Sequence, residues 1–309
     1  MQDKTGLLSQ LLRDLEAEVG TTDVAFIVLM ALVDAVNSLE VKNILEFCSQ
    51  FEQLKDSISN IEPKFGILDY YFKKMNCVVS KHFKENDFSE KRWKRLVLKQ
   101  IKDILKEANV QRHKLSEQAE KIDVENKTIL IHDHTHTVYN VLAHYKYMGK
   151  HFKVIIAEQS FDKTHTNIER MHQCQIPFQV VPAYMLSHIH NNVDMVFFGA
   201  LTLKDSMNFV MVPGAHGIIS EFNSANIPSY MFINTPKFSL WRSKSKSEIF
   251  MHKHSRKHHS KPITYERIKY SHDRVPARFF SKIVTEEGIF TPKEIKDVFE
   301  KKMSEYGDL

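Results

Sequence analysis

Apolar residues recur at intervals of three and four through the first 124 residues, which is the period of amphipathic helices. The first stripe comprises Leu7, Leu8, Leu11, Leu12 and Leu15. Gly20 is expected to end that helix, and Thr22 or Asp23 to cap the next. Similar stripes predict helices over about 40–57, 67–84 and 89–122, with Pro63 and Gly66 as a break. We therefore predict a helical N-terminal domain over residues 1–123.

The pattern changes after Val124, where short apolar runs alternate with helix-length segments. These runs are predicted strands and cover 128–132, 153–158, 178–182, 194–200 and 229–234. Strand and helix alternate at steps of about 25 residues, which is typical of a parallel sheet with helices on both faces. The sequence thus predicts an α/β C-terminal domain over 124–309.

Ligands of such sheets bind where the carboxyl ends of the strands meet their loops. Three predicted strand ends carry polar or small residues, at His132–Thr137, Glu158–Lys163 and Gly199–Asp205. We expect these three segments to converge in space and to form the candidate site.

The composition is typical of a soluble protein in a reducing compartment. The three cysteines are far apart and odd in number, so they indicate neither a disulfide framework nor a zinc ribbon. The start lacks the basic region and cleavage site of a signal peptide. The longest apolar run, 24–33, is about half of the roughly 20 residues that span a membrane. We expect a cytoplasmic protein without a membrane segment, in which this run is a buried helix.

The net charge of +5 is local rather than spread over a face. Residues 242–261 carry seven Lys or Arg and one acid, or +6, which leaves the rest of the chain near −1. Four histidines lie in the same stretch. We interpret it as a solvated basic, His-rich loop. The alternative is an electrostatic contact with an acidic partner or RNA, and nucleic acid is the weaker of these because aromatic residues are few.

The segment HDHTHT places His132, His134 and His136 at alternate positions after the first predicted strand. Alternate residues project to one side, so the pattern suits zinc or iron. No second ligand cluster follows at the later strand ends. We therefore expect polar loop residues and no metal, with a metal site as the alternative. The chain also lacks GxGxxG, GxxxxGK[ST] and GxSxG, and no cofactor is predicted.

The order of TILIH, VIIAE, VVPAYML, VFFGALTL, PKF and the closing VPARFFSKIVTEEGIFTPKEI resembles the regulatory subunits of translation initiation factor 2B. The resemblance covers 124–305 and is greatest to the alpha subunit, with beta as an alternative. It implies a helical domain on a Rossmann-like domain of the isomerase-related fold. It also implies a non-catalytic regulatory subunit of the guanine nucleotide exchange complex, which senses phosphorylated initiation factor 2. The implied partners are the other subunits, initiation factor 2 and a second copy bound through the C-terminal domain, across a surface expected within 275–305.

The superfamily also contains ribose 1,5-bisphosphate and methylthioribose 1-phosphate isomerases. The resemblance places their catalytic cysteine and aspartate on Asp133 and Leu201, and their Asn-Lys pair on Met211 and Val212, so we expect no isomerase activity. The old active site would remain as a vestigial pocket, whose residues are His132, Asp133, His134, Thr135, Glu158, Gly199 and Gly214. Protonated histidines in it would favour a sugar phosphate below about pH 6.5. A stand-alone sugar-phosphate or metal-binding relative is the alternative function.

Overall fold

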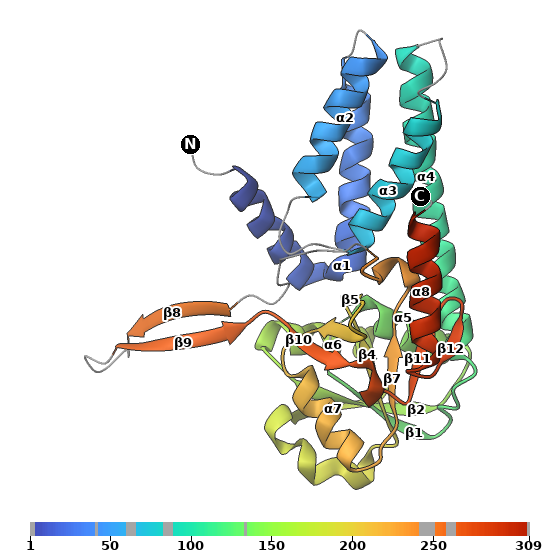
Figure 1. The fold of residues 1–309 in the computed structure, drawn as a ribbon. Coiled ribbons are helices and arrows are strands. Elements are labelled where there is room, and N and C mark those ends of the chain that lie inside the picture. The colour runs from blue at the N-terminus through green and yellow to red at the C-terminus, as the bar shows by residue number, and fades with distance from the viewer. Residues whose placement is uncertain are drawn as a thin grey trace.

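The computed structural model describes residues 4–40, 43–59, 66–82, 89–132, 135–240, 251–257 and 264–307. The predicted Asp133 and His134 of the candidate site therefore lie outside the described residues. Four helices stand on one end of an α/β body, and a two-stranded ribbon projects from its side (Figure 1).

The helical part confirms the predicted pattern. Its helices are α1 (Lys4–Ser38), α2 (Ile44–Ser59), α3 (Gly66–His82) and α4 (Glu90–Ala119). Gly20 breaks α1 as predicted, because its φ of 76° and ψ of 161° lie outside the helical region. Gly66 begins α3 after the predicted break.

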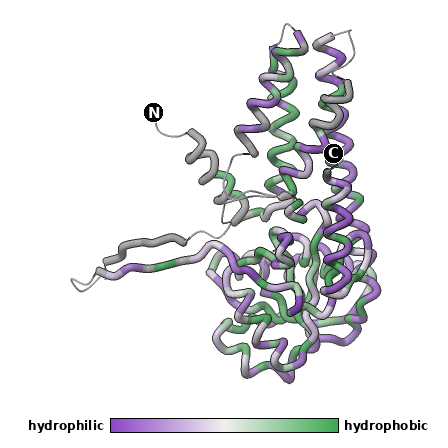
Figure 2. The backbone as a smooth tube through the Cα atoms, in the orientation of Figure 1, coloured by the Kyte–Doolittle hydropathy of each residue, from purple (hydrophilic) through white to green (hydrophobic). Residues whose placement is uncertain are grey.

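The second half of α1, Val19–Ser38, has a mean hydropathy of 1.9 and is long enough to cross a membrane. In the structure it serves as the core helix of the helical part. Val24, Leu29 and Val36 are fully buried and join one core with residues of α2, α3 and α4. This stretch is coloured as hydrophobic in Figure 2, whereas much of α4 is hydrophilic. The prediction of a buried helix is confirmed for this face, whereas Ile27 and Met30 are 44% and 55% exposed.

A seven-stranded sheet forms the centre of the α/β body, in the order β12-β11-β7-β4-β1-β2-β3. Its strands are β1 (Lys127–Ile131), β2 (Phe152–Glu158), β3 (Phe178–Pro182), β4 (Met195–Gly199), β7 (Ser229–Phe232), β11 (Lys282–Thr285) and β12 (Gly288–Phe290). All neighbours pair in parallel except β11 and β12. The predicted α/β class with a mostly parallel sheet is confirmed, and the five predicted strands are all present.

Helices cover both faces of this sheet. One face packs against α5 (His136–Tyr147), α6 (Phe161–Gln173) and the second half of α4, which contributes Leu115 and Ala119. The other face packs against α7 (Ala215–Ser224), α8 (Glu294–Gly307) and the 3-10 helix η1 (Ala183–Asn192). Because α4 belongs to both cores, it fixes the helical part to the sheet.

Some elements were not predicted. A three-stranded antiparallel sheet joins β5 (Thr202–Leu203), β6 (Asn208–Met211) and β10 (Asp273–Pro276) beside the main sheet. Two short 3-10 turns, η2 (Thr235–Lys237) and η3 (Ala277–Phe279), lie in the connections. These pieces have two to four residues each, which is too short for a periodic signal.

The expectation of a loop throughout 242–261 is wrong for part of that stretch. Residues 251–257 form β8 (Met251–Lys257), which pairs antiparallel with β9 (Thr264–Tyr270). Tyr265, Ile268 and Tyr270 of β9 are exposed, and the ribbon extends away from the body (Figure 1). Backbone pairing between the two strands outweighs the polar composition from which a loop was inferred.

Candidate functional site

The three strand ends that were expected to converge do so. Thr135 follows β1 and touches Gly199 at the end of β4, while the side chain of His132 lies beneath Gly214 at the start of α7. The charge of Lys163, at the start of α6, acts on the same imidazole. The candidate site therefore lies at the carboxyl ends of β1, β2 and β4, as parallel-sheet topology predicts.

His132 is a buried part of this site. It is 3% exposed, and its Nε2 lies 3.1 Å from the carbonyl oxygen of Pro213. Gly214 adopts a φ of +93°, and a Cβ there would lie 3.1 Å from the same Nε2. Burial lowers the pKa of His132, and the charge of Lys163 lowers it further. The direction of this shift disfavours a protonated His132, and binding of a sugar phosphate by these residues stays a prediction.

Thr135 and Gly199 close the pocket where β1 and β4 end. Thr135 is the N-cap of α5, and its Oγ1 accepts a hydrogen bond from the Val138 amide at 3.5 Å. A Cβ on Gly199 would lie only 2.2 Å from that Oγ1. Glycine is therefore required at 199 for the helix cap to sit against the strand end.

His136 binds the helical part rather than a shared metal. Its Nδ1 pairs with the carboxylate of Asp23 in α1, and Arg112 of α4 lies 3.5 Å from the same side chain. Burial raises the pKa of Asp23, but the hydrogen bond from His136 and the charges of His136, Arg112 and Lys237 lower it by more. This ion pair connects the turn after β1 to two helices.

His132 and His136, the two predicted histidines that the structure describes, have different partners. His132 contacts the Pro213 carbonyl, whereas His136 contacts Asp23. Within the described ranges, which omit residues 133–134, no group of three or more His, Cys, Asp or Glu side chains is placed to hold a metal ion. Glu158 is exposed at the end of β2.

Among the residues that the structure describes, which omit 133 and 134, one small hollow lies at the strand ends. The hollow there has a volume of about 20 Å³ and is lined by residues that include Gly20, Thr135, His136, Leu201, Val212 and Lys237. Small-molecule sites have volumes of about 300–1,000 Å³. This hollow therefore has room for about one water molecule and not for a sugar phosphate. The kink of α1 at Gly20 forms part of the wall that closes it.

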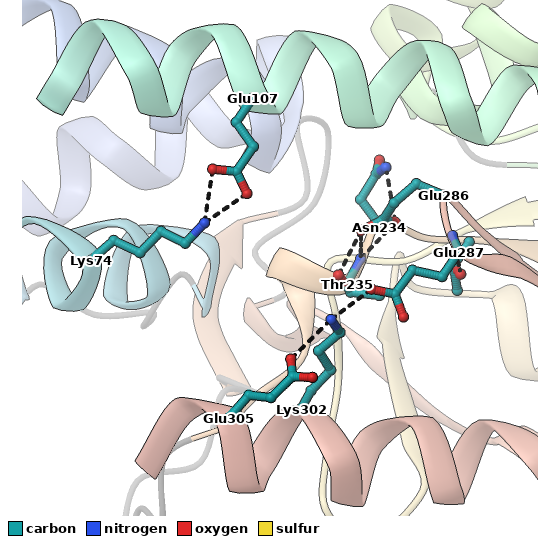
Figure 3. A network of polar contacts seen from close by, with 9 residues as sticks. Lys74, Glu107, Asn234, Thr235, Glu286, Glu287, Lys302 and Glu305 are labelled. Carbon is teal, nitrogen blue, oxygen red and sulfur yellow. Dashed lines mark hydrogen bonds and ion pairs between the residues drawn. The ribbon is translucent and has the colours of Figure 1, made fainter. Parts of the chain in front are cut away.

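Two buried charged side chains of the neighbouring turn were not predicted. Lys237 is 3% exposed, and its Nζ donates to the Ala200 carbonyl at 3.2 Å. Glu286 is 7% exposed and accepts hydrogen bonds from the Thr235 amide at 3.0 Å and the Thr235 hydroxyl at 2.6 Å (Figure 3). Burial raises the pKa of Glu286. The motifs PKF and TEEG contain Lys237 and Glu286, but the contact between Glu286 and Thr235 joins positions 51 apart and leaves no local signal.

Asn234 extends this network to the helical part. Its Nδ2 lies 3.3 Å from Glu286 Oε2 and 3.2 Å from the carbonyl oxygen of Gln111 in α4. Nearby, Lys302 of α8 pairs with Glu287 at 2.6 Å and with Glu305 at 3.1 Å (Figure 3). The carboxyl edge of the sheet is thus tied to α4 by polar contacts as well as by the shared core.

Comparisons with known proteins agree on one family. A sequence profile of the Initiation factor 2 subunit family matches residues 17–292. Translation initiation factor eIF2B subunit alpha of Dictyostelium discoideum is 26% identical over 204 residues, which are 62% of this chain and 63% of that protein. The match therefore spans less than two thirds of the curated relative.

Solved structures show the same fold at low sequence identity. Translation initiation factor eIF-2B of Pyrococcus horikoshii OT3 is similar with a TM-score of 0.75 and 14% identity, over 96% of this chain and 99% of that one. The tetrameric eIF2B-beta2-delta2 complex from C. thermophilum gives a TM-score of 0.69 at 14% identity, covering 96% and 93%. The 5-methylthioribose 1-phosphate isomerase of P. horikoshii OT3 gives 0.72 at 14% identity, covering 98% and 88%.

Proposed function

The chain belongs to the initiation factor 2 subunit family, and we propose that it is a non-catalytic, alpha-like regulatory subunit of the guanine nucleotide exchange factor for initiation factor 2. Its curated relative is an alpha subunit by name. In this proposal the chain acts in the cytosol, senses phosphorylated initiation factor 2, and binds the other exchange-factor subunits.

The small hollow at the strand ends is the observation that supports a non-catalytic function. At about 20 Å³ it has no room for a sugar phosphate. Leu201 and Val212 line it, and neither side chain can accept or donate a proton. By resemblance, Leu201 stands where the isomerases have their catalytic aspartate. The hollow is too small for the substrate, and no proton-transfer group stands at position 201. Both observations support the proposal that this chain binds partners and does not catalyse isomerisation.

We further propose that two copies associate through the C-terminal domain. The surface expected within 275–305 is not well suited, because Phe290 is half-buried and packs against the sheet core. Larger apolar exposure lies at the β3 edge of the sheet, where Tyr184 is 81% and Val180 39% exposed. An uncovered edge strand with apolar neighbours favours association between chains.

Co-expression with the other subunits of the same organism's exchange factor tests this proposal. Native mass spectrometry should find the chain in a stoichiometric complex, and a Tyr184→Glu variant should lose self-association while remaining folded. Lys296→Glu changes an exposed residue of α8 and is the matched control. A chain that stays monomeric and apart from the other subunits would contradict the proposal.

A stand-alone sugar-phosphate-binding relative is the second candidate function. Its support is the fold shared with the isomerase structure, together with the predicted pocket residues His132, Thr135, Gly199 and Gly214 at the strand ends. Binding would require the hollow to open between α1 and the strand ends. Isothermal titration with sugar phosphates distinguishes the two candidates: heat that is lost in a Gly199→Val variant supports the second, and no heat, or heat unchanged in that variant, supports the first.

A further inference from the structure

Two adjoining hollows lie at the amino-terminal ends of β1, β2 and β3, at the end of the sheet opposite the candidate site. Their volumes are about 360 and 470 Å³, and Thr128, Lys153 and Pro177 line both. Each volume lies within the range of about 300–1,000 Å³ that is typical of small-molecule sites. Among the described residues, no acidic residue lines either hollow, although Glu125 pairs with His151 at 3.1 Å beside the smaller one. These hollows are therefore much larger than the one at the carboxyl ends of the strands.

Four lysines surround the smaller of these hollows, together with His151. They are Lys127, Lys146, Lys150 and Lys153. Lys127 lies 3.5 Å from the carboxylate of Asp194. The side chains of the other three make no ion pair or hydrogen bond within the part of the chain that the structure describes. Three unpaired cations around one hollow repel each other, and a bound anion would relieve that repulsion.

Helix dipoles do not account for this arrangement. Lys146 lies in the last turn of α5, where a cation is stabilised by the negative end of the helix. Lys127 and Lys153, however, belong to β1 and β2. Their positions on adjacent parallel strands place them at one edge without any such stabilisation.

The walls of the hollow are held by backbone hydrogen bonds. The Asn126 amide donates to the His151 carbonyl at 2.7 Å, and the Lys150 amide donates to the Tyr145 carbonyl at 3.0 Å. Asn126 and Gly149 adopt φ values of 55° and 75°, which allow the two tight turns. The backbone that carries the lysines is therefore held in place. Ligand binding then orders fewer groups and loses less conformational entropy.

The lining also has an apolar component. Phe152, Ile176 and Pro177 line the same hollow, and the first two are buried in the core behind it. Pro177 is the exposed apolar residue of this lining. Ammonium groups bind phosphate as point charges, and apolar and aromatic surface accepts a flat ring. We propose that this edge of the sheet binds a phosphate-bearing ligand of nucleotide size, independently of the strand-end site.

Isothermal titration of the full-length chain with ATP and with inorganic pyrophosphate tests the proposal. ATP should bind, and raising the salt concentration should weaken it. Lys150→Ala with Lys153→Ala should weaken ATP binding about tenfold or more, because two charge-assisted contacts are lost. Lys102→Ala with Lys106→Ala removes two exposed lysines of α4 and should bind ATP as the wild type does.

Three results would overturn it. The first is no heat of binding with ATP. The second is equal affinity for ATP in the Lys150/Lys153 variant and the wild type, which would place the site elsewhere. The third is equal affinity for ATP and pyrophosphate, which would remove the role of the apolar lining and with it the nucleotide-sized ligand. Circular dichroism spectra of both double variants check that each is folded.

Discussion

Replacing Glu286 by alanine should destabilise the protein more than any replacement of the charged residues around it. Three donors would lose their acceptor, namely the Thr235 amide, the Thr235 hydroxyl and the Asn234 amide group. A buried donor left unsatisfied costs about 1–3 kcal/mol. Asn234 keeps its contact with Gln111, and loss of a buried carboxylate recovers some desolvation. The free energy of unfolding should therefore fall by about 3 kcal/mol.

Thermal and urea unfolding, followed by circular dichroism, measure this change. For a chain of 309 residues about 3 kcal/mol corresponds to a decrease in Tm of about 5 °C. Glu287→Ala is the matched control, because Glu287 is the next residue and pairs with Lys302 at a part-exposed position. Surface ion pairs contribute about 0–1 kcal/mol, so the control should unfold close to the wild type.

The pH dependence of Glu286→Gln gives an independent check. Burial raises the pKa of Glu286 above its ordinary value of 4.5, so the folded state holds the proton more tightly than the unfolded state. The contribution of this group is fully present below the unfolded pKa and is lost as the pH rises through the folded value. The stability of the wild type relative to Glu286→Gln should therefore fall as pH rises from about 4.5.

Two results would refute this reasoning. One is a Glu286→Ala variant that unfolds within about 0.5 kcal/mol of the Glu287→Ala control, which is the usual range for surface substitutions. The other is a relative stability that rises with pH across the same window. Either would mean that the buried carboxylate is not held as its contacts with Thr235 and Asn234 indicate.

Three further predictions follow from the strand-end site. Gly199→Ala should destabilise by about 1–3 kcal/mol through its clash with Thr135, and adding Thr135→Gly should recover part of the loss in urea unfolding. Asp23→Asn should lower the free energy of unfolding at neutral pH. Because the pKa of Asp23 is lowered in the folded state, the difference in stability between wild type and variant should disappear as the pH falls through the folded-state pKa. Methylthioribose 1-phosphate should show no turnover with the purified chain, and a product signal above the enzyme-free control would contradict the non-catalytic account.

Local patterns predicted the larger elements well. The apolar stripes gave α1 to α4, Gly20 gave the break in α1, and the buried runs gave five strands of the central sheet. The strands β11 and β12 and the helix α8 were not predicted, although the segment that holds them belongs to the motifs of the resemblance. The ribbon β8–β9 was missed because it has the composition of a loop.

The site was predicted in position but not in detail. Parallel topology was enough to bring Thr135, Gly199 and Gly214 to one edge of the sheet. The sequence could not show that His136 binds Asp23 of α1, or that Glu286 accepts from Thr235, because both contacts depend on how distant elements pack. The small volume of the hollow is likewise a property of that packing. The basic edge around Lys150 and Lys153 was not predicted, because it forms only where Lys127 of β1 comes beside residues 146–153 in the folded sheet.

A gentle pull-down of the untagged full-length chain from the cytosol of its own organism, with mass spectrometry of stoichiometric partners, tests the central claim most directly. The account predicts recovery of the other initiation factor 2B subunits together with the chain. Recovery of the chain alone, or only as a pair of identical copies, would contradict the regulatory-subunit function and favour a separate ligand-binding relative.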